Sequence, residues 1–113
     1  MAAMNPATAW LMLIAAGLLD VLWAVSMKLS LGYTRPGWSA LSLLALALFV
    51  FLLGRALTAL PIGAAYAAWT GIGAVGTVLA GSLLFSEALT PARLAGVALV
   101  TAGIVLLHAS GAR

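Results

Sequence analysis

The sequence predicts an all-α membrane protein with four transmembrane helices, and three observations lead to that prediction. The 113 residues are 65% hydrophobic, and only 6% of them are charged. A soluble domain carries about 25% charged residues to cover its surface. The apolar residues fall into four blocks, each close to the roughly 20 residues that a helix needs to cross a bilayer. Helices are expected because lipid leaves backbone groups no partners outside a helix or a closed barrel.

Charged residues and prolines divide the chain into these blocks. Lys28 ends the first block, Pro36 and Pro61 precede the second and third, and Pro91 precedes the fourth. Proline suits the first turn of a helix but cannot continue one. We therefore expect one transmembrane domain over residues 1–113, with spans at about 7–28, 38–57, 62–85 and 92–109. Nearly the whole chain is used, which leaves no room for a soluble domain.

The basic residues mark the ends of the spans. They are scattered along the chain, so no basic patch for a nucleic-acid partner is expected. With both termini on one side of the membrane, that side would hold Arg55 and Arg113, and the other Lys28, Arg35 and Arg93. The positive-inside rule predicts orientation from an excess of Lys and Arg on one side, and two residues against three is almost no excess. This near balance is equally compatible with insertion in both orientations and with one orientation fixed by other details.

Asp20 is the candidate functional residue of the first span. It is the only ionisable side chain before Lys28, and a carboxylate near the centre of a membrane helix costs about 2.5 to 3.5 kcal/mol. Such a group indicates a proton or cation site; the alternative is a buried acid hydrogen-bonded to a neighbouring helix. Residues three or four apart share a helix face. Gly17 and Trp23 therefore share the face of Asp20 and offer close approach and an aromatic wall.

The third span carries a second cluster, in which Tyr66, Trp69 and Gly73 share one face. A tyrosine hydroxyl can hydrogen-bond a carboxylate, and the face of a tryptophan can hold a cation at about 0.5 to 2 kcal/mol. Gly71 and Gly73 lie at mid-span, where we expect them to permit a bend. Glycine is also simply frequent in transmembrane helices.

The fourth span is expected to serve assembly. Gly96 and Gly103 are seven residues apart on one face, and small residues let helices pack closely in lipid. His108 is expected to be solvated. The sequence has no cysteine, and it shows no metal cluster, nucleophile–base pair or phosphate loop. Asp20 and Glu87 lie at different depths and make a poor acid–base pair. No metal, no cofactor and no enzymatic activity are therefore expected.

These segments resemble the small multidrug resistance family of four-helix bacterial transporters. The matching stretches are residues 16–24, 28–35, 60–76 and 96–103. Trp23-Ala24 after the acid and the segment 70–76 are most similar to the guanidinium-exporter subtype. The resemblance implies an antiparallel, dual-topology homodimer, embedded in lipid as a multi-pass protein of the bacterial inner membrane. It also implies exchange of protons, as the coupling ion, for a guanidinium-type cation.

The resemblance also assigns roles to residues. Asp20 would bind the proton and the cation, in a site lined by Gly17, Trp23, Tyr66 and Trp69, with Gly71 and Gly73 as a bend and Gly96 and Gly103 as the dimer contact. Two departures leave the exact substrate open. The family acid is a glutamate, one methylene longer than Asp20. Members of this subtype usually place a serine in the second helix where this chain has Phe49, which we include in the site.

Competition between a proton and a cation for Asp20 would couple their movements across the membrane. Guanidinium fits this role because its planar donors can pair bidentately with a carboxylate. Three alternatives remain open at this point. The cargo could be a quaternary ammonium or other lipophilic cation held by Trp23, Phe49 and Trp69. The chain could be one subunit of a heterodimer, or a small assembly or pore-forming membrane protein without a transport cycle.

Overall fold

The computed structural model describes residues 5–110, which form four α-helices joined by short connections. The helices are α1 (Pro6–Leu29), α2 (Pro36–Ala56), α3 (Ile62–Phe85) and α4 (Pro91–Ala109). Each of them is long enough and apolar enough to cross a membrane. The predicted all-α fold, with four helices capable of crossing a membrane, is thus confirmed.

Prolines and side-chain caps define the starts of the helices. α2 begins at Pro36 and α4 at Pro91, slightly before the spans expected at 38 and 92, because proline fits the first helical turn. At α1, the Asn5 side chain accepts a hydrogen bond from the backbone N–H of Ala7 at 2.8 Å. At α4, the hydroxyl of Thr90 accepts one from the N–H of Arg93 at 3.2 Å. These contacts satisfy N–H groups that the first turn leaves without partners.

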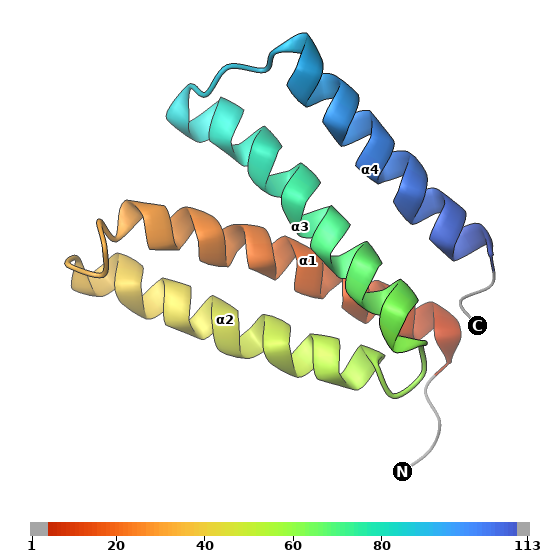
Figure 1. Cartoon of the computed structure of the whole chain (residues 1–113). Helices are drawn as coiled ribbons and strands as arrows, with labels where there is room; N and C mark the ends of the chain where they lie inside the picture. The colour runs from red at the N-terminus through yellow and green to blue at the C-terminus, as the bar shows by residue number, and fades with distance from the viewer. Residues whose placement is uncertain (1–4, 111–113) are drawn as a thin grey trace.

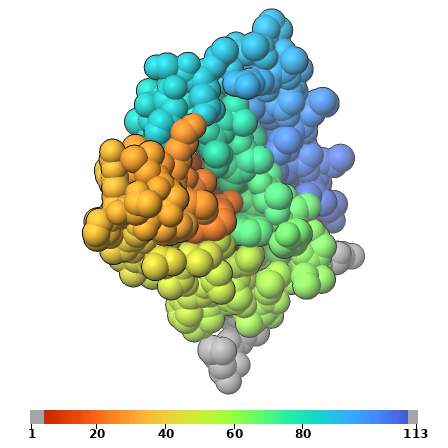
Figure 2. Space-filling model, turned by 60° about the vertical axis from the view of Figure 1, so that its left-hand side comes forward, coloured from red at the N-terminus to blue at the C-terminus, as the bar shows by residue number. Residues whose placement is uncertain are grey.

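The four helices form an open slab (Figure 1). α1 packs against both α2 and α3, and α3 packs in turn against α4. In Figure 2, atoms of α1 are visible between the yellow atoms of α2 and the green atoms of α3. The slab measures 41 × 37 × 16 Å along its principal axes. α4 lies at its edge and has no buried residue.

Small residues allow α1 and α3 to approach each other closely. A Cβ atom added at Gly17 would lie 2.8 Å from the Cβ of Ile72, closer than two carbon atoms can pack. A Cβ added at Gly76 would collide with Val21 in the same way. Such pairs of a glycine and a branched side chain bring helix backbones together in lipid, where packing drives association.

The buried core lies near the helix ends that adjoin the α2–α3 connection. Its buried members come from α1, from the end of α2 and its following turn, and from α3: Ala9, Trp10, Leu13, Ala56, Leu60, Ala65 and Ala68. Trp10 and Leu13 fill the space that the alanines leave between the backbones. This cluster fixes the register of α1 against α3 and thereby the level at which Asp20 meets α3.

The turn between α1 and α2 is folded back onto the helices. Leu31, Gly32 and Tyr33 all have left-handed backbone conformations, with φ of 52°, 74° and 66°. The hydroxyl of Ser30 accepts a hydrogen bond from the N–H of Tyr33 at 2.9 Å, which holds this tight turn. The phenol oxygen of Tyr33 then lies 2.9 Å from the hydroxyl of Ser42, a fully buried residue of α2.

Candidate functional site

Asp20 lies within α1, partly buried against α3. A Cβ atom added at Gly73 would collide with the carboxylate oxygen Oδ2 of Asp20, so only glycine leaves room for the acid there. Within residues 5–110, the side-chain hydrogen bonds and the ion pair involve other residues, and none reaches the Asp20 carboxylate. The alternative of an acid hydrogen-bonded to a neighbouring helix is therefore not seen in this part of the chain.

Four aromatic side chains from three helices form a continuous row next to this acid. Trp23 of α1 lies 5.5 Å from Phe49 of α2, and Phe49 lies 5.6 Å from Trp69 of α3, measured between ring centroids. Tyr66 extends the row at 5.5 Å from Trp69. We call these four residues the aromatic row. Phe49 is 4% exposed whereas Tyr66 is 59% exposed, so the row is buried at Phe49 and reaches the surface at Tyr66.

The spacing of residues along α1 and α3 places Asp20 close to the aromatic row. Trp23 follows Asp20 by three residues on α1, and Trp69 precedes Gly73, which contacts Asp20, by four residues on α3. A Cβ at Gly17 would lie 3.7 Å from the carbonyl oxygen of Trp69, so Gly17 also belongs to this interface. The structure thus brings together the residues expected at the site: Asp20, Gly17, Trp23, Phe49, Tyr66 and Trp69. Their role in binding a proton or a cation stays a prediction.

Two hydrogen-bond donors at this place have no acceptor. The indole Nε1 atoms of Trp23 and Trp69 are buried, and neither finds a hydrogen-bond partner among the residues that the structure describes. A buried donor without a partner costs about 1 to 3 kcal/mol. Native proteins contain few such groups. Of the three such side-chain atoms found in residues 5–110, two belong to the aromatic row, and the third is Nε of Arg55 near the end of α2.

The two mid-span glycines of α3 are points of helix contact. α3 is continuous from Ile62 to Phe85. Gly71 faces α4, where an added Cβ would lie 2.9 Å from Ile104 Cδ1. Gly73 faces Asp20 on the other side. Each glycine thus has a packing reason for being there, and the bend expected at these positions stays a prediction.

The residues expected at a dimer contact lie on a free face of α4. An added Cβ at Gly96 or Gly103 would meet no atom within 4 Å. This face is therefore open in the single chain, and the dimer contact stays a prediction. His108, expected to be solvated, is exposed but also packs edge-to-face on Trp10, with ring centroids 4.9 Å apart.

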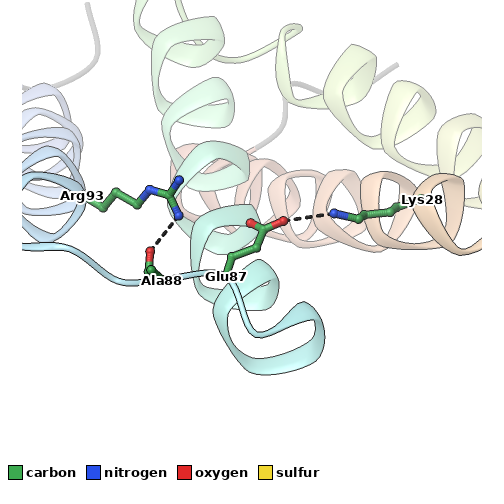
Figure 3. A network of polar contacts seen from close by, with 4 residues as sticks. All are labelled: Lys28, Glu87, Ala88 and Arg93. Atoms are coloured by element: carbon green, nitrogen blue, oxygen red, sulfur yellow. Dashed lines mark hydrogen bonds and ion pairs between the residues drawn. The ribbon is translucent and has the colours of Figure 1, made fainter.

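One polar network was not anticipated from the sequence. The ammonium of Lys28 at the end of α1 lies 3.0 Å from Oε2 of Glu87 in the α3–α4 connection, as Figure 3 shows. The same ammonium lies 4.7 Å from the ring centroid of Phe85. Arg93 donates to the carbonyl oxygen of Ala88 at 2.7 Å. Lys28 ends the first span and Glu87 follows the third, so both residues lie on the same side of the membrane. This shared side is the sequence feature that could have predicted their contact.

Ser42 is a second residue that sequence reasoning missed. It is fully buried, and besides contacting Tyr33 it donates to the carbonyl oxygen of Trp23 at 3.5 Å. It precedes Phe49 by seven residues and so lies on the same face of α2. This seven-residue spacing is the sequence feature that could have placed Ser42 on the face of α2 that carries Phe49. Ser42 connects the α1–α2 turn to the backbone of a residue in the aromatic row.

Fold and site together define a class: small multi-pass membrane proteins with an intramembrane carboxylate beside aromatic rings. The family described as Small Multidrug Resistance protein matches residues 8–100. The chain belongs to this family. It is a multi-pass membrane transporter of the bacterial inner membrane.

The chain is also similar to curated relatives over most of its length. It is 48% identical to the guanidinium exporter of Yersinia pseudotuberculosis serotype I over 97 residues, which cover 86% of this chain and 93% of the relative. It is 45% identical to the guanidinium exporter of Citrobacter freundii over 101 residues, covering 89% of this chain and 96% of the relative. The guanidinium exporter of Salmonella typhimurium strain LT2 is 46% identical with the same coverage.

Proposed function

We propose that this protein exports guanidinium or similar small guanidinyl cations in exchange for protons, and that Asp20 holds each passenger in turn. The single observation that carries this proposal is the Asp20 carboxylate inside a membrane helix, without a protein partner among the described residues and next to the aromatic row. The relatives named guanidinium exporters support the choice of cargo.

The chemistry of the site suits a flat cation. A guanidinium ion presents parallel N–H groups that match the two oxygens of a carboxylate. Aromatic faces attract cations through their quadrupole, and most strongly where water is excluded. Gly73 has no side chain, which leaves the Asp20 carboxylate space on its α3 side. These features together favour a planar cation that lies against the aromatic row while it pairs with Asp20.

Exchange follows from the cost of an empty site. A charged carboxylate inside the membrane is unfavourable by about 2.5 to 3.5 kcal/mol. Either a proton or a bound cation removes most of this cost, and each excludes the other from the same oxygens. If the protein opens to only one side of the membrane at a time, the guanidinyl cation moves outward only when a proton moves inward. The proton gradient supplies the driving force, and no cofactor is needed.

We further propose that the working unit is an antiparallel homodimer. α4 has no buried residue, and its Gly96 and Gly103 face open space, so a large apolar surface remains for a second copy. Small residues favour helix association in lipid. The near balance of basic residues between the two sides permits both orientations. An inverted second copy would contribute its own Asp20 and close the site on its open side.

The test uses the purified protein in lipid vesicles with a pH-sensitive dye inside. A guanidinium gradient should drive proton movement in the opposite direction, and Asp20→Asn should abolish it. Glu87→Gln is the matched control, because it makes the same chemical change outside the site. Proton-coupled guanidinium transport that survives Asp20→Asn would refute the proposal. Proton leak without cation exchange would favour a pore, and transport of tetraethylammonium alone would favour a multidrug exporter.

A further inference from the structure

The candidate site offers few hydrogen-bond acceptors, and two of its buried donors lack a partner. The indole N–H groups of Trp23 and Trp69 can only donate, and both are buried without a partner in the described part of the chain. The phenyl ring of Phe49 offers neither a donor nor a strong acceptor. The side-chain acceptors among the predicted site residues are therefore the carboxylate of Asp20 and the phenol oxygen of Tyr66.

Phe49 makes the α2 side of the site apolar. Its ring lies between the rings of Trp23 and Trp69, at 5.5 and 5.6 Å, and the residue is 4% exposed. The nearest hydroxyl on the same face of α2 belongs to Ser42, which already contacts Tyr33 and the carbonyl oxygen of Trp23. α2 therefore offers an incoming cation no free polar group at the level of the aromatic row.

Unsubstituted guanidinium is poorly matched to such surroundings. It carries N–H groups on all three of its nitrogens, and a carboxylate can pair with only one edge of the ion. A second Asp20 from an inverted copy would occupy a second edge. The third edge would then face aromatic rings, and donors left unpaired away from water are costly. A carbon substituent on that edge replaces one of these N–H groups with apolar surface, whose transfer out of water is favourable.

Resting on the proposed function above, we propose that Phe49 determines which guanidinyl cations the site accepts. It favours guanidinyl cations that carry a flat apolar substituent over unsubstituted guanidinium. Phe49 acts as a positioning residue: it separates Trp23 from Trp69 and holds both indoles as one wall. The wall covers the substituent, while Asp20 pairs with the guanidinyl group.

The test compares two cargoes in the same protein, guanidinium and phenylguanidinium, by proton-coupled transport in vesicles. The ratio of their kcat/KM values is the readout, because a general loss of folded protein lowers both values equally. We expect the unmodified protein to favour phenylguanidinium by about tenfold or more, the range that one apolar group gains in a matching pocket. Phe49→Ser removes the ring and adds an acceptor, and it should bring the ratio to about one or reverse it.

Phe49→Leu is the matched control, since it removes the ring but adds no polar group. It should keep most of the preference for phenylguanidinium. Equal or better transport of unsubstituted guanidinium by the unmodified protein would overturn the inference without any variant. An unchanged ratio in Phe49→Ser would overturn it as well. Failure to exchange either cation for protons would instead refute the proposed function and the inference with it, so the two failures can be told apart.

Discussion

Gly73 of α3 lies against the carboxylate of Asp20 on α1, so closely that any side chain at position 73 would occupy the space of the acid. The acid that the proposed mechanism needs therefore depends on the absence of a side chain on another helix. Gly17 and Gly76 bring the same two helices together on either side of this contact. Each of these three contacts between α1 and α3 thus pairs a glycine with a larger side chain, and in one of them that side chain is the acid.

Gly73→Ala should abolish or strongly reduce transport, because the added methyl group displaces the Asp20 carboxylate or pushes α1 away from α3. Overpacking of this kind also costs about 1 to 3 kcal/mol of stability. Gly63→Ala on the same helix is the control, since an added Cβ there meets nothing within 4 Å. Vesicle transport and thermal unfolding in detergent would be measured for both. Normal transport by Gly73→Ala would show that the contact with Asp20 is unimportant.

Glu87→Gln should leave transport intact and lower stability only slightly. The Lys28–Glu87 ion pair is at the surface, with side chains 57% and 44% exposed. Exposed pairs contribute about 0 to 1 kcal/mol and are weakened by salt. The difference in unfolding temperature between the two proteins should therefore shrink in high salt. A large, salt-independent loss of stability would mean that this network has a structural role beyond its charge.

Tyr33→Phe should destabilise the protein by about 0.5 to 1.5 kcal/mol, the usual net value of one hydrogen bond. It removes the hydroxyl that contacts Ser42 at 2.9 Å. Ser42→Ala should cost more, because Ser42 is fully buried and also contacts the carbonyl oxygen of Trp23. The double variant should lose less than the sum of the single losses, as expected for residues that share one contact. Strictly additive losses would mean that the two hydroxyls do not interact.

Gly103→Leu should weaken dimer formation while the single chain stays folded. An added Cβ at this position meets no atom of its own chain, so the larger side chain would disturb only a second copy. Ala98→Leu, an exposed position of α4 turned away from Gly103, is the control. Chemical cross-linking in vesicles would report the dimer, and circular dichroism the helices. A dimer unaffected by Gly103→Leu would contradict the proposed role of this face.

The four helices could be predicted from the sequence because lipid forces each apolar block of this length into a helix. Their boundaries moved slightly at Pro36 and Pro91, since hydropathy does not register that proline fits a first turn. The helical repeat also placed Gly17 and Trp23 on the face of Asp20. It could not show that Gly73 receives the acid, because periodicity assigns a face to a helix but not the neighbour that this face meets.

Other features depend on contacts between distant residues and were out of reach for the same reason. The burial of Phe49 between two indoles requires the relative depth of three helices. The contact of Tyr33 with Ser42 requires a turn with three successive left-handed residues. Only Gly32 among them is a residue type that favours this conformation. The proton and cation roles of the site residues, the bend at Gly71 and Gly73, and the dimer contact remain predictions.

The helix at the edge of the slab has no buried residue and packs on the rest of its chain with one side only, through residues such as Ile104. Changes on the outer side of α4, away from Ile104, can therefore accumulate without altering Asp20, Gly73 or the rings around them. The choice of partner subunit can consequently change between bacterial lineages while the exported cation stays the same. The exported cation can likewise change while the partner stays the same. Substitutions in α1 and α3 should correlate with the exported cation, and substitutions in α4 should correlate with the partner subunit.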